Sequence, residues 1–288
     1  MQSSQVALIT GCSSGIGEAT ARRLIQDGWI VWATARKEES LGALKAAGAL
    51  TAALDVLDEA SMQRVVAQIE AEHGAVGALI NNAGYSLSGA LETLPMDAVR
   101  KQFETTVFGL LRLTQLVLPG MRRAGRGRIV NIGSMGGRFT FPGGGAYHAS
   151  KHAVEALSDA LRFEVKGFGV DVILLEPGII RTGFAEAALQ AMPEKAKEND
   201  DPYAAFNAAV AKATEEVYKT GPLNALGGEP SDVAEVVSRA LQARKPKARY
   251  TVTASASVLL GLRATLSDAG WDRLLAGSFP RPGGRASA

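Results

Sequence analysis

Residues 6–17 have the sequence VALITGCSSGIG, and this stretch decides the fold class. The apolar run at its start predicts a buried strand, and a helical pattern begins at Ile16. Between them, Gly11 permits a tight turn, Gly15 lets the backbone approach a pyrophosphate, and Gly17 lets the helix pack close to the strand. The N–H groups and the dipole at the start of the helix attract phosphates. The stretch therefore predicts a dinucleotide-binding turn, with an ordinary glycine-rich loop as the alternative.

Short apolar runs alternate with amphipathic stretches outward from this turn. Strands are predicted at residues 6–10, 30–35, 50–55, 78–80, 128–132 and 170–176, with a candidate seventh at 249–253. The long helices between them are predicted at 16–27, 59–72, 97–123 and about 146–166. Alternating strands and helices of this length favour right-handed βαβ crossovers. The sequence therefore predicts an α/β fold, a doubly wound parallel β-sheet (Rossmann fold) with helices on both faces.

No linker divides the chain, so we predict one domain over residues 1–288. Its core covers residues 5–184, and an Ala-rich helical segment at about 184–228 is predicted to insert as a lid over the substrate. A helix, the seventh strand and a tail follow over residues 229–288. Ser231 is the predicted N-cap of that helix, because a serine hydroxyl caps well and an apolar helix face follows it. The polar end, residues 279–288, is expected to fray.

Composition excludes several classes of protein. The 288 residues are 47% hydrophobic and 21% charged, a profile too apolar for a disordered chain. A formal net charge of +2 indicates no nucleic-acid partner. The single Cys12 allows no disulfide within the chain, and three histidines without zinc spacing predict no metal site. The first residues lack a secretory pattern and no run reaches the ~18–20 apolar residues of a membrane span, so a cytoplasmic location is expected.

The end of the second predicted strand indicates which dinucleotide is bound. An NAD-selective site usually has a carboxylate there for the ribose 2′-hydroxyl, but residues 33–37 are Ala-Thr-Ala-Arg-Lys and the first carboxylate is Glu38. A guanidinium can bind a 2′-phosphate with two hydrogen bonds and stack on adenine. We therefore predict NADP(H) over NAD(H), with Arg36 as the main determinant and Ser13 or Lys37 assisting. The alternative for Arg36 is a solvated loop charge.

Tyr147 and Lys151 stand four residues apart in the last long helix of the core, which places them on one helix face. A free tyrosine has a pKa of about 10, and an ammonium beside it stabilises the phenolate and lowers that pKa toward the working range. Ser134 follows the strand at 128–132, at the carboxyl edge where doubly wound sheets bind ligands. The three residues are the predicted catalytic group.

Taken together, these positions resemble a known family. The sequence is similar to the single-domain branch of the short-chain dehydrogenase/reductases. The matches run in order over about residues 5–184, at Thr10-Gly11-x-x-x-Gly15-x-Gly17, Asp55-Val56, Asn81-Asn82-Ala83-Gly84, Ser134, Tyr147-x-x-x-Lys151 and Pro177-Gly178-x-x-x-Thr182. Residues 246–250 resemble members that act on retinoid- or steroid-like compounds. The resemblance implies an oxidoreductase that transfers hydride between a nicotinamide cofactor and a carbonyl or secondary alcohol.

The resemblance also implies a role for each matched residue. Tyr147 would be the general acid/base, Ser134 would position the reacting oxygen, and Lys151 would lower the tyrosine pKa and bind the nicotinamide ribose. The cofactor site would comprise the phosphate loop (Gly11, Ser13, Ser14, Gly15, Ile16, Gly17) with Arg36, then Asp55 and Val56 at the adenine, Asn82, Ala83 and Gly84 along the ribose channel, and Pro177, Gly178, Ile180 and Thr182 at the carboxamide.

One position departs from the family pattern. Members usually have an asparagine that supports a water relay to the lysine, in a pattern like Asn-Val-x-Gly, whereas this chain has Thr106-Val107-Phe108-Gly109. A hydroxyl can still hold a water, and the backbone carbonyl remains, but the amide donor is gone. The hypothesis is a relay that survives in altered form.

Apolar and aromatic residues after the fourth, fifth and sixth strands predict a hydrophobic ketone or aldehyde as substrate. The candidate contacts are Tyr85, Leu87, Met135, Phe139, Phe141, Phe184 and Met192, with Tyr203 and Phe206 in the lid. His148 and His152 are predicted to point away from the catalytic pair, into packing or the surface. A catalytically weak NADP(H)-binding regulator and an epimerase- or dehydratase-type relative are the alternatives. Those relatives usually have a different glycine turn and a longer chain. The resemblance implies a homodimer or homotetramer.

Overall fold

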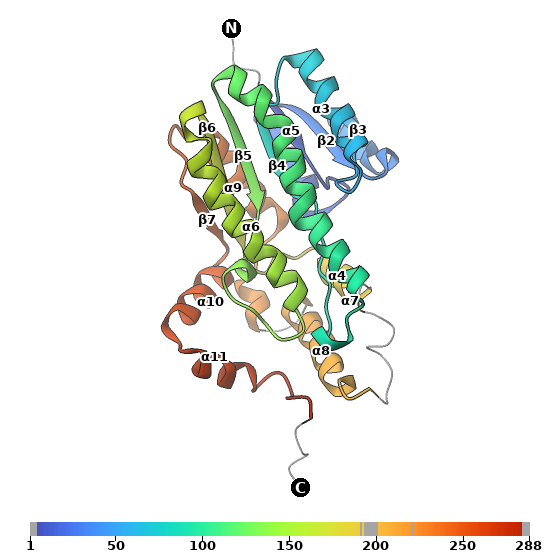
Figure 1. Ribbon diagram of the computed structural model, residues 1–288, viewed down its shortest axis with the longest axis vertical. Helices are drawn as coiled ribbons and strands as arrows, with labels where there is room; N and C mark the ends of the chain where they lie inside the picture. The colour runs from blue at the N-terminus through green and yellow to red at the C-terminus, as the bar shows by residue number, and fades with distance from the viewer. Residues whose placement is uncertain (1–4, 191, 193–200, 220–221, 284–288) are drawn as a thin grey trace.

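Seven parallel strands form one sheet in the part of the chain that the computed structural model describes, residues 5–190, 192, 201–219 and 222–283 (Figure 1). The strands are β1 (Val6–Ile9), β2 (Ile30–Ala35), β3 (Leu50–Ala53), β4 (Ala78–Asn81), β5 (Gly127–Ile132), β6 (Val170–Pro177) and β7 (Arg249–Val252). Their order is β3-β2-β1-β4-β5-β6-β7, and every neighbouring pair is parallel. The predicted doubly wound α/β fold is confirmed. The order reverses between β1 and β4, and such a reversal opens a ligand crevice at the carboxyl ends of the strands.

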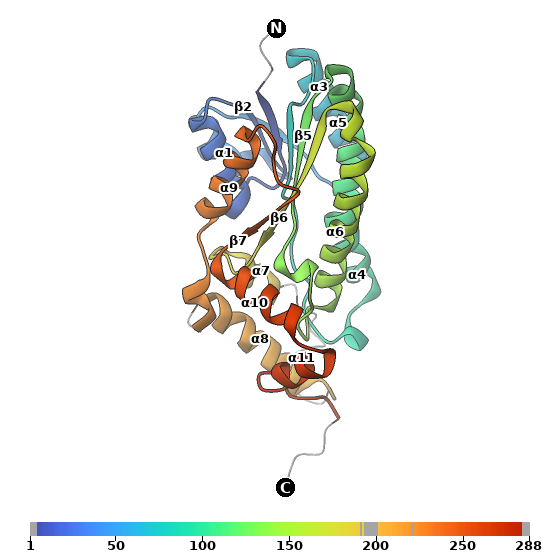
Figure 2. The same ribbon diagram turned by 90° about the vertical axis from the view of Figure 1, so that its left-hand side faces the viewer.

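Helices cover both faces of the sheet, as Figure 2 shows. On one face lie α1 (Gly15–Gln26) and α9 (Pro230–Gln242), and on the other lie α3 (Glu59–His73), α5 (Gly109–Ala124) and α6 (Gly145–Glu164). Neighbouring residues of β1 contribute to both cores. Ile9 belongs to the same buried cluster as Leu24 of α1, whereas Leu8 belongs to the cluster that contains Val66 of α3 and Val117 of α5. The strands read as continuous apolar runs because both of their faces are buried.

The helix predicted at residues 97–123 is interrupted in the structure. It consists of α4 (Met96–Phe103), a π-helical segment at Glu104–Phe108, and α5. A π segment adds residues to a turn and often occurs at functional sites. Directly after it, a side chain at Gly109 would meet the Val56 carbonyl oxygen at 2.6 Å, so the helix approaches that backbone closely. Hydrophobic periodicity alone does not reveal so local a change of winding.

The predicted N-cap of α9 is wrong. The helix begins at Pro230, and its N-cap is Glu229 rather than Ser231. Glu229 and Asp232 form a capping box, in which the Glu229 N–H donates to the Asp232 carboxylate at 2.7 Å. Proline has a φ already suited to the first helical position and needs no N–H there. The helix therefore starts one residue before the predicted cap.

Four more helices gather at the carboxyl end of the sheet (Figures 1 and 2). They are α7 (Phe184–Gln190) and α8 (Ala204–Lys219) in the predicted lid, and α10 (Ala254–Thr265) and α11 (Asp268–Leu275) after β7. A short 3-10 segment (Glu38–Leu41) and α2 (Gly42–Ala46) connect β2 to β3. The sequence analysis did not predict α10 and α11. The tail predicted to fray begins at Phe279, whose N–H donates to the Leu275 carbonyl, and residues 284–288 lie outside the described residues.

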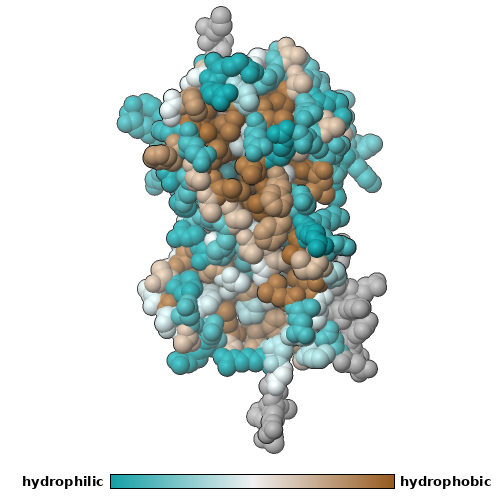
Figure 3. Space-filling model, viewed as in Figure 1, coloured by the Kyte–Doolittle hydropathy of each residue, from teal (hydrophilic) through white to brown (hydrophobic). Residues whose placement is uncertain are grey.

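The face formed by α5 and α6 carries exposed apolar side chains, seen as brown surface in Figure 3. Among them, Phe163 is 87% exposed, Phe108 is 51% exposed and Phe168 is 47% exposed. Exposed apolar groups of this size on neighbouring elements are typical of surfaces that contact another protein. Among the described residues, the helices are too short or too polar to cross a membrane.

Candidate active site

A cavity of about 1500 Å³ opens at the carboxyl ends of the strands. Its lining includes nearly every residue predicted to bind cofactor or catalyse. These are Gly11, Ser13, Ser14, Gly15, Ile16, Arg36, Asp55, Val56, Asn82, Ala83, Gly84, Ser134, Tyr147, Lys151, Pro177, Gly178, Ile180 and Thr182. Gly17 lies behind the wall. The fold thus brings together residues from the ends of β1, β2, β4, β5 and β6, as the reversal of strand order requires.

The glycine turn after β1 has the geometry that its sequence predicted. Gly11 has φ +73° and Gly15 has φ +58°, a backbone region that disfavours residues with a side chain. At Gly17, a Cβ would collide with the Gly11 carbonyl oxygen and would lie 2.6 Å from the Asn82 amide nitrogen. The third glycine is therefore required for helix α1 to pack against the turn. Gly15 and Ile16, the first residues of α1, line the cavity, and the N–H groups at the start of a helix favour anions.

Asn82 supports the turn from behind, in addition to lining the cavity. Its side-chain amide donates to the carbonyl oxygens of Thr10 at 2.9 Å and of Gly11 at 3.1 Å. In return, the Thr10 hydroxyl accepts from the N–H groups of Asn82 and Ala83, both at 3.0 Å. These bonds tie the end of β4 to the glycine turn, so the part of the site formed by Asn82 is also a structural clamp.

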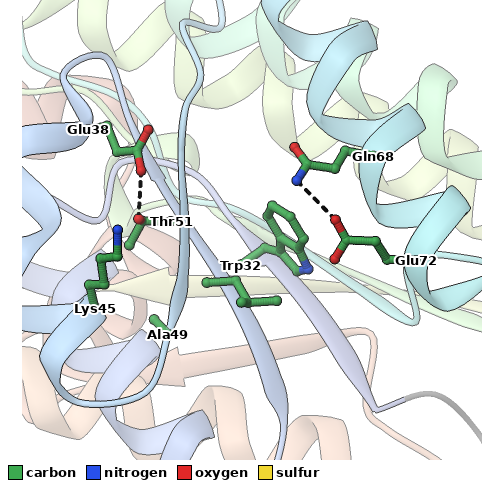
Figure 4. A pocket seen from close by; sticks show the side chains of 8 residues that line it. Trp32, Glu38, Lys45, Ala49, Thr51, Gln68 and Glu72 are labelled. Atoms are coloured by element: carbon green, nitrogen blue, oxygen red, sulfur yellow. Dashed lines mark hydrogen bonds between the residues drawn. The ribbon is translucent and has the colours of Figure 1, made fainter.

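Of the first charged residues after β2, the cation Arg36 lines the cavity and the carboxylate Glu38 does not. Arg36 is exposed and lines the cavity, and it forms no ion pair with another described residue. The Glu38 carboxylate instead accepts a hydrogen bond from Thr51 at 2.8 Å. It lines a separate hollow of about 230 Å³ at the β3 edge, together with Lys45 and Trp32 (Figure 4). The first carboxylate after β2 is thus held outside the cavity that Arg36 faces.

The three predicted catalytic residues meet at the end of β5. Tyr147 and Lys151 lie one turn apart on α6, and the Lys151 Nζ is 5.9 Å from the centre of the Tyr147 ring. That Nζ donates to the Ile132 carbonyl at 2.7 Å. Ser134 comes two residues after the end of β5, and its side chain is a hydrogen-bonding neighbour that lowers the pKa of Tyr147. The arrangement places two hydroxyl groups and an ammonium around one point of the cavity.

Burial shifts the pKa values of this group. The pKa of Tyr147 is raised, not lowered as predicted, because burial disfavours the phenolate and the Ser134 side chain opposes that rise only in part. Burial also lowers the pKa of Lys151 to about 8, because an ammonium loses hydration inside the protein. The tyrosine is therefore protonated at neutral pH, the state needed to donate a proton to a carbonyl oxygen.

Gln102 supports the cavity wall from behind, and the sequence analysis did not predict it. It is fully buried on α4, and its Nε2 donates to the Thr106 hydroxyl at 2.8 Å and to the Tyr85 carbonyl at 3.1 Å. Its Oε1 accepts from the Leu87 N–H at 3.0 Å. An amide donor therefore does reach Thr106, from one helical turn earlier. The spacing of four residues between Gln102 and Thr106 was the available signal.

The predicted substrate residues divide into two groups. Tyr85, Leu87, Met135, Phe141 and Phe184 line the cavity. The other four candidates do not: Phe139 packs against Trp271 at 5.4 Å between ring centres, Met192 is buried elsewhere, the Tyr203 hydroxyl donates to Glu92, and Phe206 packs beside Tyr203. For Phe139, packing against the C-terminal helix α11 replaces the predicted contact, and for Tyr203 a bond to Glu92 replaces it.

Much of the apolar wall comes instead from α8 and from the C-terminal helices. The lining residues there are Ala209, Val210, Ala213, Val217 and Tyr218 in α8, Val258, Leu259 and Leu262 in α10, Trp271, Leu274 and Leu275 in α11, and Phe279 beyond it. Burial and the nearby Tyr147 both raise the pKa of Tyr218, and the Phe184 ring packs against both tyrosines. The tail residue Phe279, predicted to fray, is part of this wall.

A cluster of charges fixes the C-terminal part of the chain to the catalytic helix. Arg249 of β7 donates to Glu155 at 3.1 Å and to Asp159 at 2.6 Å, both on α6, and its Nε lies 3.6 Å from the Glu176 carboxylate. Burial, then the nearby Glu176, raises the pKa of Glu155 to about 7. Glu155 is one turn beyond Lys151, so the cluster braces the helix that carries the catalytic pair.

Comparison with known proteins identifies the family. Residues 5–193 match the family model described as short chain dehydrogenase. The chain belongs to this family. Short-chain dehydrogenases are oxidoreductases that act between alcohol and carbonyl groups with a nicotinamide dinucleotide, and this chain is one of them.

Several relatives have named activities. The chain is 43% identical over 183 residues to the 3-ketodihydrosphingosine reductase of Bacteroides thetaiotaomicron, which covers 63% of this chain and 66% of that reductase. It is 38% identical over 272 residues to human 17-beta-hydroxysteroid dehydrogenase type 1, covering 90% of this chain and 80% of that enzyme. It is 36% identical over 257 residues to the NADPH-dependent 3-dehydrocapnine reductase of Ornithobacterium rhinotracheale, covering 85% of this chain and 87% of that reductase.

Solved structures of short-chain dehydrogenases have the same fold. The enzyme from Streptomyces avermitilis is 34% identical, with a TM-score of 0.75 over 96% of this chain and 99% of that one. A serine dehydrogenase complexed with NADP+ is 29% identical, with a TM-score of 0.74 over 92% of this chain and 97% of that one. The short-chain dehydrogenase from Burkholderia phymatum, in complex with NAD, is 27% identical, with a TM-score of 0.76 over 98% of each chain. Both dinucleotides thus occur among structures similar to this one.

Proposed function

We propose that this short-chain dehydrogenase is an NADP(H)-dependent oxidoreductase of hydrophobic ketones or aldehydes, with Tyr147 as the general acid/base. The observation that carries the proposal is the meeting of Ser134, Tyr147 and Lys151 at the carboxyl end of β5, inside the cavity that the glycine turn also lines. No feature of the described site favours a regulator without activity.

The lining of the cavity supports the binding of a dinucleotide. Gly11, Ser13, Ser14, Gly15 and Ile16 line it where phosphates are expected, and Asp55 and Val56 line the place expected for adenine. Pro177, Gly178 and Thr182 also line the cavity and are the residues expected to hold the nicotinamide carboxamide. When bound there, the nicotinamide supplies or accepts the hydride.

The chain's own residues handle the proton. In reduction, Ser134 holds the carbonyl oxygen by a hydrogen bond, and the Tyr147 hydroxyl donates its proton to that oxygen as negative charge develops on it. The buried Lys151 Nζ lies 5.9 Å from the centre of the Tyr147 ring, and its ammonium stabilises the phenolate that remains. In alcohol oxidation, the same tyrosine takes the proton back.

The preference for NADP(H) rests on the end of β2. Arg36 faces the cavity without an ion pair to another described residue, and the nearest carboxylate in sequence, Glu38, is bound by Thr51 outside the cavity. An unpaired guanidinium attracts a 2′-phosphate and a carboxylate would repel it. Of the other predicted contacts, Ser13 lines the cavity and Lys37 does not.

The apolar walls support a hydrophobic substrate. Residues of α8, α10 and α11, with Phe141 and Phe184, enclose the space beside Tyr147, and such walls favour lipophilic molecules. The names of three relatives, a 3-ketodihydrosphingosine reductase, a 3-dehydrocapnine reductase and a hydroxysteroid dehydrogenase, agree with this class. We also infer one domain with the lid at about 184–228, a cytoplasmic location, and a homodimer or homotetramer formed through the α5 and α6 face.

The direct test of the function is NADPH oxidation with a panel of carbonyl compounds. We expect turnover with lipophilic ketones and aldehydes, seen as loss of absorbance at the nicotinamide band, and little with polar sugars. NADH should support less turnover than NADPH with the same substrate. A panel in which polar sugars react faster than every lipophilic ketone would contradict the substrate class.

Arg36→Asp should abolish the preference for NADPH. We expect the Kd for NADPH to rise by about 10–100-fold, because a charge-assisted contact is lost and a repulsive carboxylate is added, while the Kd for NADH changes little. Fluorescence titration of both reduced cofactors measures the ratio. Lys37→Asp changes the same charge one residue away, outside the cavity, and is the matched control. An unchanged ratio in Arg36→Asp would show that Arg36 does not select the cofactor.

A further inference from the structure

His148 follows the catalytic tyrosine directly, and its ring is buried between α6 and the loop that carries Ser134. The Nδ1 atom is 2.9 Å from the Gly136 carbonyl oxygen. A carbonyl oxygen only accepts, so Nδ1 carries the proton and donates it. Burial lowers the pKa of His148 to about 4, with His152 adding to the decrease and the Gly136 bond opposing it, so the ring is neutral at neutral pH.

The loop is shaped around this ring. A Cβ at Gly136 would collide with Nδ1 and lie 2.6 Å from Cε1, and a Cβ at Gly144 would lie 2.7 Å from both Nε2 and Cδ2. Both positions have negative φ, so the glycines are explained by the space that His148 occupies and not by backbone conformation. The prediction that His148 points away from the catalytic pair is wrong, because its ring lines the cavity and lies 5.4 Å, centre to centre, from that of Tyr147. His152 is exposed, as predicted.

Gly136 links this ring to Ser134 through the two peptide groups that flank its Cα. Its N–H, in the peptide group before the Cα, donates to the Ser134 Oγ at 3.0 Å, while its carbonyl, in the peptide group after the Cα, is held by His148. A hydroxyl oxygen that accepts from a fixed N–H has one lone pair committed, so its own proton points elsewhere. On the cavity side, Tyr147 is the neighbour whose pKa the Ser134 side chain lowers by hydrogen bonding. The serine thus accepts from a backbone segment that a histidine fixes one peptide group further along.

We propose that His148 is a positioning residue that acts on Ser134 through the backbone on both sides of the Gly136 Cα and so fixes the direction in which the serine hydroxyl donates. The proposal rests on the proposed function, in which Ser134 holds the reacting oxygen. It accounts for a buried imidazole beside the catalytic tyrosine and for two glycines that make room for it. Because the effect passes through Ser134, it should vanish when the Ser134 hydroxyl is absent.

The kinetic test is a double-mutant cycle with a rescue variant. His148→Phe keeps a ring against Tyr147 but removes the donor, and we expect kcat to fall about 10-fold or more with a smaller change in KM, since small misplacement of a catalytic group slows chemistry strongly. In a Ser134→Ala background the same change should have little further effect. In His148→Asn the amide Nδ2 is bonded to Cγ, as the histidine Nδ1 is, so it supplies an N–H at a similar place and should restore most of kcat. His152→Leu, one turn along α6, is the control and should leave kcat unchanged.

A second measurement needs no substrate. Amide hydrogen exchange at Gly136, followed by NMR, should speed up several-fold in His148→Phe and return toward the wild-type rate in His148→Asn. An unchanged rate at Gly136, or an equal loss of kcat from His148→Phe with and without Ser134, would overturn the proposal. If the wild-type protein reduces no carbonyl compound with NADPH, the proposed function fails, and the exchange rates still decide whether His148 holds this peptide.

Discussion

Tyr147→Phe should lower kcat for carbonyl reduction by about 10³-fold, because positioned acid–base groups contribute about 10²–10⁴-fold to rate. That loss corresponds to about 4 kcal/mol of activation free energy. The phenyl ring retains the contacts with His148 and Phe184, at 5.4 Å and 5.7 Å between ring centres, so the cavity keeps its shape. The variant lacks only the Tyr147 hydroxyl, which neighbours Ser134 and whose pKa burial raises, so that it is protonated at neutral pH. Steady-state rates of NADPH consumption measure the effect.

Binding separates this loss from a loss of structure. The Kd of Tyr147→Phe for NADPH, from fluorescence titration, should stay within a few-fold of the wild-type value. Tyr203→Phe is the matched control, because that hydroxyl donates to Glu92 outside the cavity, and its kcat should be unchanged. A Tyr147→Phe protein that keeps a tenth or more of the wild-type kcat would exclude Tyr147 as the proton donor.

Gly17→Ala should weaken both folding and cofactor binding. The added methyl group would collide with the Gly11 carbonyl and crowd the Asn82 amide, and both are held by the clamp between β1 and β4. Overpacking against fixed backbone costs about 1–3 kcal/mol, and we expect the upper end of that range here. The glycine turn must shift to relieve the contact, so the Kd for NADPH should rise by about 100-fold. Thermal unfolding and fluorescence titration measure the two effects.

A second glycine serves as the control for this substitution. Gly42 begins α2 with helical backbone, and a Cβ added there would have no described neighbour within 4 Å, so Gly42→Ala should be neutral or slightly stabilising. Wild-type stability and affinity in Gly17→Ala would mean that the turn relaxes freely and that the third glycine is not required for packing.

The strands and the glycine turn could be predicted because their causes are local. Both faces of the central strands are buried, so these strands appear as short apolar runs bounded by glycine or charge. The predicted bounds of all seven strands agree with the structure to within about two residues. The spacing of Gly11, Gly15 and Gly17 follows from steric contacts within one turn. The predicted cofactor residues gather in one cavity because the carboxyl ends of parallel strands share an edge.

The features that were missed depend on contacts between distant segments. The π segment at residues 104–108 lies next to the point where Gly109 packs on the backbone of Val56, and hydrophobic periodicity does not reveal that contact. Phe139 and Tyr203 are aromatic residues at plausible positions, but Phe139 packs against Trp271 without lining the cavity itself, and the Tyr203 hydroxyl donates to Glu92 outside it. Gln102 is buried because its amide bonds to Thr106, Tyr85 and Leu87 at once, and the loop that carries the last two is brought there only by the fold.

The C-terminal wall of the cavity has a consequence for how such enzymes diversify. The groups proposed to handle proton and cofactor lie within residues 11–182, whereas α10, α11 and Phe279 add apolar surface after the family match at residues 5–193 has ended. Arg249 anchors this later segment to α6 through Glu155 and Asp159. Sequence change beyond residue 253 can therefore remodel the shape of the accepted molecule while the reacting atoms stay where they are. Transplanting residues 254–279 between relatives is, on this view, a way to exchange substrates while the redox chemistry is inherited intact.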